Sequence, residues 1–253
     1  MSQVDPLIWN LYQTFDLIGV LLNGIIGGTI ARQRNFDFVG FVFLALFSAL
    51  GGGMLRDVLM QRGTAAAIAD STYLLLALIG ATIALVTDLK GKSWEYFKVH
   101  GDAIILGVWA VTGCVKALTY SVPLVPAVFM GVLTAVGGGM IRDVVTGQIP
   151  TIFGGGTLYA VPATVSATAM VIFYQYDLNA LGMIISPLLG GGLAIVSYWK
   201  GWVLFRSAEW APVNMTAAQV RSLVRRSENK GWKLGRKARN AISESTSNTE
   251  THE

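Results

Sequence analysis

The sequence predicts an all-α integral membrane protein with seven transmembrane helices, arranged as two inverted three-helix repeats plus a seventh helix. Composition is the first observation behind this prediction, because only 13% of the 253 residues are charged, against about 25% in soluble domains. The second observation is a set of apolar runs whose lengths suit a bilayer. The third is a glycine-rich motif with charged residues that occurs twice, 86 residues apart.

Composition also excludes several classes of protein. A soluble chain of this length covers its surface with charged side chains, and this one has only 19 basic and 15 acidic residues. An ordinary soluble enzyme, a nucleic-acid-binding module and a disordered chain are therefore excluded. The single Cys114 cannot form a disulfide within the chain, and with two histidines we expect no metal cluster and no cofactor. No catalytic triad or phosphate-binding loop is present, so we expect no enzyme.

The uncharged runs have about the 20 residues that a helix needs to cross a bilayer. Residues 144–176 are too many for one helix, and the turn residues of Gly-Gln-Ile-Pro at 147–150 and of the glycine triplet at 154–156 predict a loop before a helix that begins near Leu158. Residues 1–15 lack the basic segment of a cleavable signal peptide. We expect seven spans, near residues 16–33, 38–60, 71–89, 102–119, 122–145, 158–176 and 179–199.

The chain repeats itself with a shift of 86 residues. Eight residues of segment 49–58 recur in segment 135–144. Because each copy holds three spans, an odd number, the second copy enters the membrane from the opposite side. The predicted organisation is an N-terminal segment (1–15), a first three-helix repeat (16–89), a second three-helix repeat (102–176), a seventh helix (178–200) and a basic tail (201–253).

Basic residues predict the orientation in the membrane. Arg32 and Arg34 follow the first span, and three lysines between residues 90 and 98 follow the third. Both loops lie on the same side as the tail, where residues 200–253 hold ten of the 19 basic residues. We therefore expect a multi-pass protein of the cell membrane, with its N-terminus outside and its C-terminus in the cytoplasm.

A glycine triplet falls near the middle of the second span and of the fifth. In water each glycine weakens a helix by about 0.8–1 kcal/mol relative to alanine. One interpretation is that both helices break near the midplane, where freed carbonyls face a permeant ion or a small solute. The alternative is that the glycines only allow helices to pack closely. The six residues are Gly51, Gly52, Gly53, Gly137, Gly138 and Gly139.

An arginine and an aspartate follow each triplet, as Arg56-Asp57 and Arg142-Asp143. Each charged side chain is unfavourable by about 2.5–3.5 kcal/mol if it faces lipid. Because consecutive residues of a helix point about 100° apart, the two neighbours are not expected to neutralise each other. We predict an Asp16–Arg56 pair and an Asp102–Arg142 pair instead. These pairs either gate the two ends of an aqueous path or bridge the helices of each repeat permanently.

Two further polar residues could line such a path. Lys116 follows Asp102 by 14 residues, about 21 Å along a helix, which predicts a position near the outer interface. There it either snorkels toward water or lines the path. Ser48 precedes the first triplet and either lines the path or bonds a neighbouring helix. No metal is expected beyond a permeant cation.

The duplicated Gly-Gly-Gly-x-x-Arg-Asp motif resembles that of the trimeric intracellular cation (TRIC) channel family, in its prokaryotic branch. The matching segments are Ala49–Leu59 and Ala135–Val145, and the resemblance covers about residues 12–200. Segments that support it are Asp16-Leu17-Ile18-Gly19, Thr112-Gly113, Pro150 and Tyr159-Ala160. The resemblance implies a homotrimer with one pore in each subunit and kinked helices at the triplets. It also places the two Arg-Asp pairs at or beside the pore.

What the resemblance implies about function is a monovalent cation channel, with potassium favoured and sodium as the other candidate ion. The repeat architecture also fits a secondary transporter of a small neutral solute such as glycine, which some bacterial relatives are thought to be. A third reading is a structural membrane protein whose charged pairs only hold the bundle together.

The tail has its own pattern. Residues 216–219 read as the capping box of a short helix, and eight Lys or Arg residues follow between 221 and 239. This cluster either attracts anionic lipid or is solvated and only enforces the orientation. Residues 243–253 are predicted to be disordered. We expect membrane lipids, and no nucleic acid, among the partners.

Overall fold

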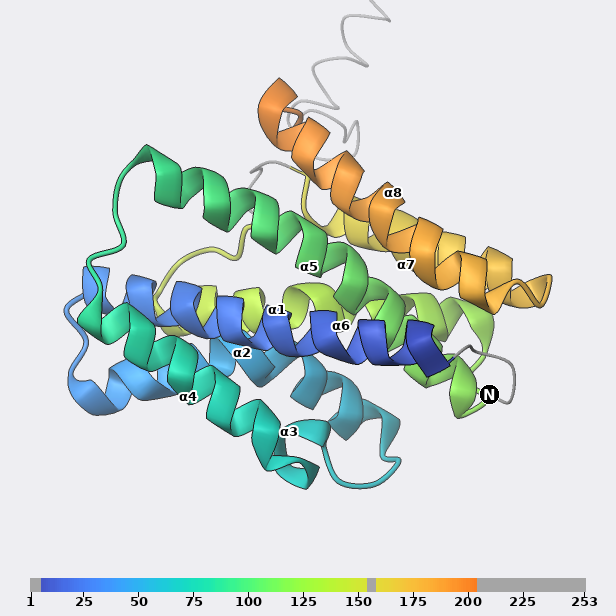
Figure 1. Ribbon diagram of the computed structural model, residues 1–253, viewed down its shortest axis with the longest axis horizontal. Helices are drawn as coiled ribbons and strands as arrows, with labels where there is room; N and C mark the ends of the chain where they lie inside the picture. Colours follow the sequence, from blue (N-terminus) through green and yellow to red (C-terminus); the bar gives the residue numbers. More distant parts are fainter. Residues whose placement is uncertain (1–5, 154–157, 204–253) are drawn as a thin grey trace, which may run out of the picture. The chain divides into compact units, whose positions relative to one another are not determined.

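Residues 6–153 and 158–203 are described by the computed structural model, and they form eight helices (Figure 1). The basic cluster of the tail and its predicted short helix lie outside these residues. The helices are α1 (Pro6–Gln33), α2 (Phe38–Met60), α3 (Ala66–Ala69), α4 (Ser71–Val86), α5 (Lys92–Thr119), α6 (Leu124–Val145), α7 (Ala160–Gln175) and α8 (Asn179–Lys200).

The predicted all-helical membrane fold is confirmed. Five of the described helices, α1, α2, α5, α6 and α8, are long and apolar enough to cross a bilayer. The apolar helices α4 and α7 are shorter, with 16 residues each. Seven crossings therefore remain a prediction, in which the two shorter helices also span the membrane.

Two helices begin ten residues before the spans that the sequence predicts. The sequence suggested spans that begin at Asp16 and Asp102, but α1 begins at Pro6 and α5 at Lys92. Both helices continue through the aspartate because each carboxylate accepts a hydrogen bond from a tyrosine hydroxyl on a neighbouring element. A buried carboxylate with a hydrogen-bond donor does not require a helix end in water.

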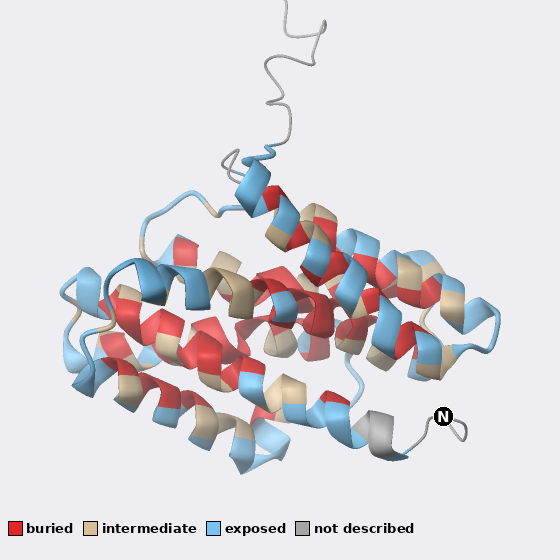
Figure 2. Ribbon diagram, turned by 45° about the horizontal axis from the view of Figure 1, so that its top comes forward, coloured by how far each residue is buried: buried red, intermediate tan, exposed pale blue. Residues whose placement is uncertain are grey.

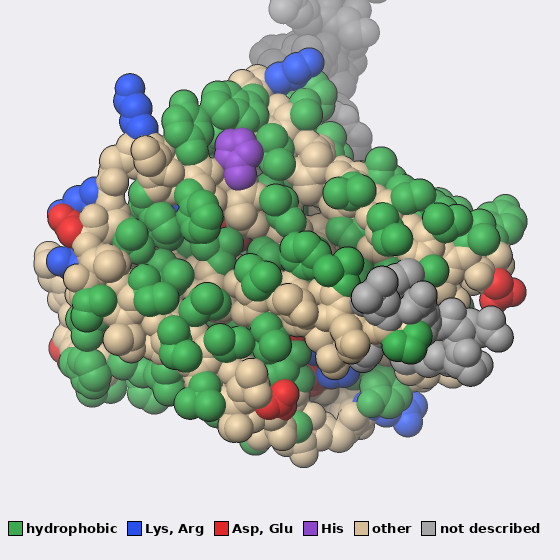
Figure 3. Space-filling view, in the orientation of Figure 1, with side chains coloured by type: hydrophobic (Ala, Val, Ile, Leu, Met, Phe, Trp, Pro, Cys, Tyr) green, Lys and Arg blue, Asp and Glu red, His purple; other side chains and the backbone are tan. Residues whose placement is uncertain are grey.

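The side chains are distributed as a bilayer requires. Buried residues lie where helices face one another (Figure 2), and much of this core is alanine and glycine. One face of the molecule is mostly hydrophobic or neutral, with its charged side chains toward the edges (Figure 3). Large apolar residues such as Phe38, Val125 and Leu188 are well exposed on the outside. An exposed apolar surface of this kind suits contact with lipid or with other subunits.

The two repeats pack in the same way. In the first, α1 packs on α2 and α4, and in the second, α5 packs on α6 and α7. Helices α2 and α6 then cross each other at the glycine triplets. A Cβ on Gly52 would collide with the Thr134 carbonyl oxygen, and a Cβ on Gly138 would collide with the Ser48 carbonyl oxygen. These two contacts exchange under the 86-residue shift, which is the signature of a two-fold relation between the halves.

The remaining members of the triplets complete the crossing. A Cβ on Gly51 would lie 3.3 Å from the Gly138 Cα, and a Cβ on Gly137 would lie 2.9 Å from the Gly52 Cα. The third glycines differ, because the nearest neighbour of a Cβ on Gly53 would be Arg56 Nη2 at 3.8 Å. The first two glycines of each triplet therefore allow backbone-to-backbone packing, as the packing alternative expected.

The expected break in the second and fifth spans is wrong. Both α2 and α6 are continuous α-helices through their glycine triplets, so their carbonyls are not freed for an ion. The physical reason is that tight packing between the two helices fixes the backbone and offsets the low helix propensity of glycine. A kink without a break stays a prediction.

Alanine substitution within one triplet separates packing from helix propensity. Gly52→Ala should destabilise the protein by about 1–3 kcal/mol, because the added methyl overpacks the crossing. Gly53→Ala is the matched control, since its methyl would make only an ordinary contact with Arg56 Nη2 at 3.8 Å and alanine favours the helix. Thermal unfolding in detergent measures both variants. Equal transition temperatures for the two would contradict the backbone crossing described here.

Candidate functional site

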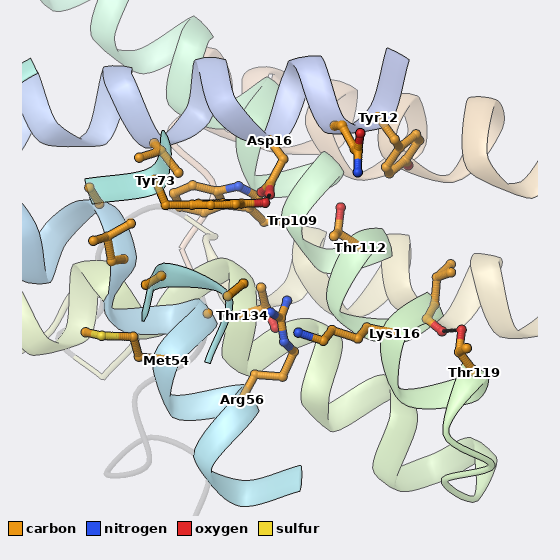
Figure 4. A pocket seen from close by; sticks show the side chains of 18 of the residues that line it. Tyr12, Asp16, Met54, Arg56, Tyr73, Trp109, Thr112, Lys116, Thr119 and Thr134 are labelled. Atoms are coloured by element: carbon orange, nitrogen blue, oxygen red, sulfur yellow. Dashed lines mark hydrogen bonds between the residues drawn. The ribbon is translucent and has the colours of Figure 1, made fainter. Parts of the chain in front are cut away.

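A cavity of about 340 Å³ lies among α1, α2, α5 and the start of α4 (Figure 4). It continues to Thr134 on α6, beside the glycine crossing, so it leads from one end of the bundle toward its centre. Most of the lining is apolar, but the charged side chains of Asp16, Arg56 and Lys116 also reach it. A space of this size with converging polar groups is typical of binding sites and solvated paths.

Asp57 is the centre of the ionic contacts beside this cavity. Its Oδ1 accepts from Arg56 Nε and from Lys116 Nζ, each at 2.8 Å, and its Oδ2 accepts from the Ala66 backbone N–H at 3.0 Å. The side chains of Arg56 and Asp57 are 7% and 5% exposed. One buried carboxylate therefore holds two cations, one from its own helix and one from α5.

Asp16 lies on the cavity wall without joining this cluster directly. Its Oδ2 accepts a 2.5 Å hydrogen bond from the Tyr73 hydroxyl, which comes from the first turn of α4. The Trp109 ring lies next to the same carboxylate (Figure 4). Tyr12, one helical turn before Asp16, is buried in the lining, and its hydroxyl has no hydrogen-bond partner within the described part of the chain.

The second repeat builds the same arrangement. Arg142 donates to Asp143 Oδ1 from Nη2 at 2.8 Å and from Nε at 3.0 Å. The Thr151 backbone N–H donates to Asp143 Oδ2 at 3.2 Å. The Tyr159 hydroxyl donates to Asp102 Oδ2 at 2.8 Å. Each of these residues is the counterpart of a first-repeat residue at a shift of 86 positions, with one exception. The counterpart of Ala66 would be residue 152, but the backbone donor is Thr151.

The predicted ion pairs are wrong in their partners. Asp16–Arg56 and Asp102–Arg142 do not occur among the ion pairs of residues 6–153 and 158–203. Each arginine instead pairs with the aspartate that follows it. The long arginine side chain bends back toward its neighbour, so the 100° between their directions does not separate them. Asp16 and Asp102 each accept a hydrogen bond from a tyrosine instead.

The two halves are not identical. Of the two alternatives for Lys116, its 2.8 Å contact with Asp57 and its place in the cavity lining favour the second over snorkelling; its side chain is 30% exposed. The counterpart of Lys116 in the first repeat is the apolar Ile30, and the counterpart of Trp109 is Asn23. The cavity end therefore carries a cation and an aromatic ring that the equivalent positions of the other half lack.

Near the centre, Ser48 is fully buried, and its hydroxyl has no partner among the described residues. Its counterpart Thr134 bonds the Met130 carbonyl and lines the cavity. The third glycine of each triplet faces its arginine, Gly53 toward Arg56 and Gly139 toward Arg142. No group of three His, Cys, Asp or Glu side chains placed to hold a metal ion occurs in residues 6–153 and 158–203.

The two tyrosines were not predicted as site residues from the sequence. Tyr73 and Tyr159 lie 86 residues apart, like the aspartates that they bond. Their 86-residue spacing could have identified them as a repeated pair, but the residues around them differ between the two copies, so the repeat is hard to see there. Trp109 and Tyr12 were also missed, because an aromatic residue in an apolar span carries no pattern that marks a polar site.

Comparison with known proteins places these features in a family. A family model described as "Glycine transporter" matches residues 13–88 and again residues 100–175. The chain belongs to this family. The chain is also similar to UPF0126 membrane proteins. One from Deinococcus radiodurans is 33% identical over 156 residues, 61% of this chain and 73% of the relative. One from Vibrio cholerae is 33% identical over 176 residues, 69% of this chain and 70% of the relative.

Solved structures with the same fold are TRIC channels. A TRIC cation channel structure concerned with conductance is 28% identical, covers 77% of this chain and 96% of its own, and has a TM-score of 0.69. The trimeric intracellular cation channel orthologue from Rhodobacter sphaeroides is 27% identical, covers 75% and 98%, and has a TM-score of 0.66. The TRIC resemblance predicted from the duplicated motif is thus confirmed, and the chain is a multi-pass membrane protein.

Neutralising the two central aspartates tests the difference between the halves. Asp57→Asn should destabilise the protein by about 3–5 kcal/mol. The reason is that buried Arg56 and its neighbour Lys116 would both lose the carboxylate that neutralises them. Asp143→Asn is the matched control; it releases only Arg142 and should have the smaller effect. Thermal unfolding in detergent at one pH compares them. A larger loss in Asp143→Asn would show that Lys116 adds nothing to the first site.

Proposed function

We propose that the protein is a monovalent cation channel, with potassium as the favoured ion and a path of its own in each subunit. The observation that carries this proposal is the cavity between α1, α2 and α5, which brings compensated charges and polar groups into the interior of a membrane protein. The likeness to TRIC cation channels at 27–28% identity supports it.

Charge balance around the cavity suits a cation. Arg56 and Lys116 would repel a positive ion, but both are held on Asp57, which offsets part of their charge. Asp16 is bonded by neutral Tyr73 rather than by a cation. Its carboxylate is therefore the negative group left to attract a passing ion, and the aromatic and hydroxyl-bearing walls offer it further polar contacts.

The path in this proposal runs from the cavity along the faces of the third glycines to the second-repeat site. At Gly53 and Gly139 a Cβ would have no neighbour within 4 Å except the arginine of the same helix. The Arg142–Asp143 pair and the Tyr159–Asp102 bond then form the opposite end. In this arrangement the two Arg-Asp pairs and the two aspartates act as gating or pore-lining groups, and Gly51–Gly53 and Gly137–Gly139 act as the kinks.

The assembly and orientation belong to the same proposal. We infer a homotrimer, which the trimeric Rhodobacter sphaeroides orthologue supports. The N-terminus lies outside and the C-terminus lies in the cytoplasm, as the lysines and arginines of the loops favour. The basic tail contacts anionic lipid on that side.

Substitution of Asp16 tests the conducting role. Asp16→Asn should lower the potassium conductance of the protein in planar bilayers by roughly 20- to 30-fold, because a unit charge about 8–10 Å from an ion contributes roughly 2 kcal/mol at an effective dielectric constant near 20. The control is Asp88→Asn, which removes an exposed carboxylate whose pairing with Lys90 contributes little. Equal conductance in Asp16→Asn and wild type would remove Asp16 from the path.

The second-repeat site is tested by Arg142→Ala. Altered gating or flux in the folded variant is expected, whereas unchanged flux would reject a gating role for the Arg142–Asp143 pair. The same bilayers and vesicles separate the functional classes. Saturable uptake of glycine without channel-scale current would replace the channel by a transporter, and the absence of both activities would leave a structural protein.

A further inference from the structure

An aromatic and histidine cluster joins the end of α8 to the beginning of α5. The rings of Tyr96 and Trp199 stack with centroids 5.5 Å apart and planes 18° apart. His100 lies beside them, with its ring centroid 5.9 Å from that of Trp199. α5 has 28 residues, more than the roughly 20 that a bilayer core needs. Its charged residues Lys92 and Glu95 precede this cluster, so His100 lies near the membrane surface, within reach of protons in solution.

The hydrogen bonds of His100 fit one form of the ring. Its Nδ1 lies 2.8 Å from the Tyr96 carbonyl oxygen, which can only accept. Its Nε2 lies 3.3 Å from Trp199 Nε1, which can only donate. A neutral imidazole with its proton on Nδ1 satisfies both contacts, whereas an imidazolium carries a proton on both nitrogens. Charging the ring therefore places two N–H donors against each other.

The end of α8 is linked in turn to the second-repeat site. The Leu158 backbone N–H donates to Ser197 Oγ at 3.2 Å and to the Trp202 carbonyl oxygen at 3.3 Å. The next residue, Tyr159, bonds Asp102. Ser197 and Trp199 share the last turns of α8, so the helix that touches His100 also positions Tyr159.

The first repeat lacks this device. The counterpart of His100 there is Thr14, whose hydroxyl bonds the Asn10 carbonyl of its own helix. The first-repeat tyrosine, Tyr73, is placed by the capped start of α4, where Asp70 accepts from the Thr72 backbone N–H. Among the described residues, only the half that contains α8 therefore connects its aspartate to a titratable ring.

We propose that His100 is a proton-sensitive contact which holds the second-repeat end of the path in its present arrangement. Protonation of the ring separates His100 from Trp199 and releases the last turns of α8. The Leu158 and Tyr159 contacts loosen with them, Asp102 is freed, and passage of cations rises. Histidine suits this role because its charge ordinarily changes between pH 5 and 8.

Titratable or charged groups also lie on the elements around this contact and around the second-repeat site. Asn23 on α1 reaches Asp102 as a neutral group. Lys200 lies with its Nζ 5.4 Å from the Trp202 ring centroid. The titratable or charged groups on the described elements at this end are Lys92, Glu95, Tyr96, Lys98 and Asp102 on α5, Arg142 and Asp143 on α6, Tyr159 before α7, and Tyr198 and Lys200 on α8.

Nitrogen NMR of the full-length protein in lipid tests the contact without any transport assay. The chain has only two histidines, so ¹⁵N-histidine labelling of the His252→Gln variant reports His100 alone. We expect a neutral ring with its proton on Nδ1 at pH 8 and a charged ring at pH 5.5, with a shift of the Trp199 indole signal. A proton on Nε2 at pH 8, or an unmoved indole signal, would overturn the proposal.

Ion flux tests the consequence, and this arm rests on the proposed channel function. Potassium efflux from proteoliposomes at pH 5.5 should exceed that at pH 8 by about 2- to 10-fold, the effect of one hydrogen bond on an equilibrium. His100→Gln keeps an acceptor for Trp199 and should give low flux at both pH values. Trp199→Phe removes the donor and should give high flux at both.

The control for the flux arm is His252→Gln, which should keep the wild-type response. Wild-type pH dependence that survives in both His100→Gln and Trp199→Phe would overturn the proposal. Absence of potassium flux from the wild type at every pH would refute the channel function, and the NMR result would then decide the contact independently.

Discussion

The crossing of α2 and α6 is the contact on which the rest of the structure depends. Glycines at its centre let the two backbones meet, with Gly52 against the Thr134 carbonyl and Gly138 against that of Ser48. In a membrane, where apolar side chains gain little by leaving lipid, such close packing is a main source of helix association. Because the crossing relates the repeats by a two-fold axis, it also places the two charged sites on opposite sides of the centre.

Each charged site shows how an ion pair is tolerated inside a bundle. The central aspartate receives donors on both oxygens, from its neighbouring arginine and from the backbone after the helix. Desolvation of such groups is offset only when their lone pairs and protons are paired. The backbone donors are Ala66, the first residue of α3, and Thr151, in the loop after α6, so the segments that follow α2 and α6 complete the sites rather than merely connect helices.

Much of the fold could be predicted because its signals are local. Uncharged runs mark the spans, and the duplicated triplet marks the repeat. The ion-pair partners could not be predicted, because they depend on the conformation of the long arginine side chains. The angle of about 100° between consecutive helix residues argued against the Arg56–Asp57 contact, which nevertheless forms. The helix starts were missed because Asp16 and Asp102 resemble span ends in sequence. Only the tertiary contacts with Tyr73 and Tyr159 show why these carboxylates lie inside helices.

The reciprocal crossing has a consequence for the origin of the chain. The contacts at the triplets use backbone atoms and glycines that each repeat supplies alike, so one three-helix unit carries everything needed to bind an oppositely inserted copy of itself. Two separate, identical chains could close the same interface. Fusion into one chain frees each copy to change alone, which is how Lys116 can face Asp57 while Ile30 occupies the matching place. A symmetric ancestor could not have had two different ends.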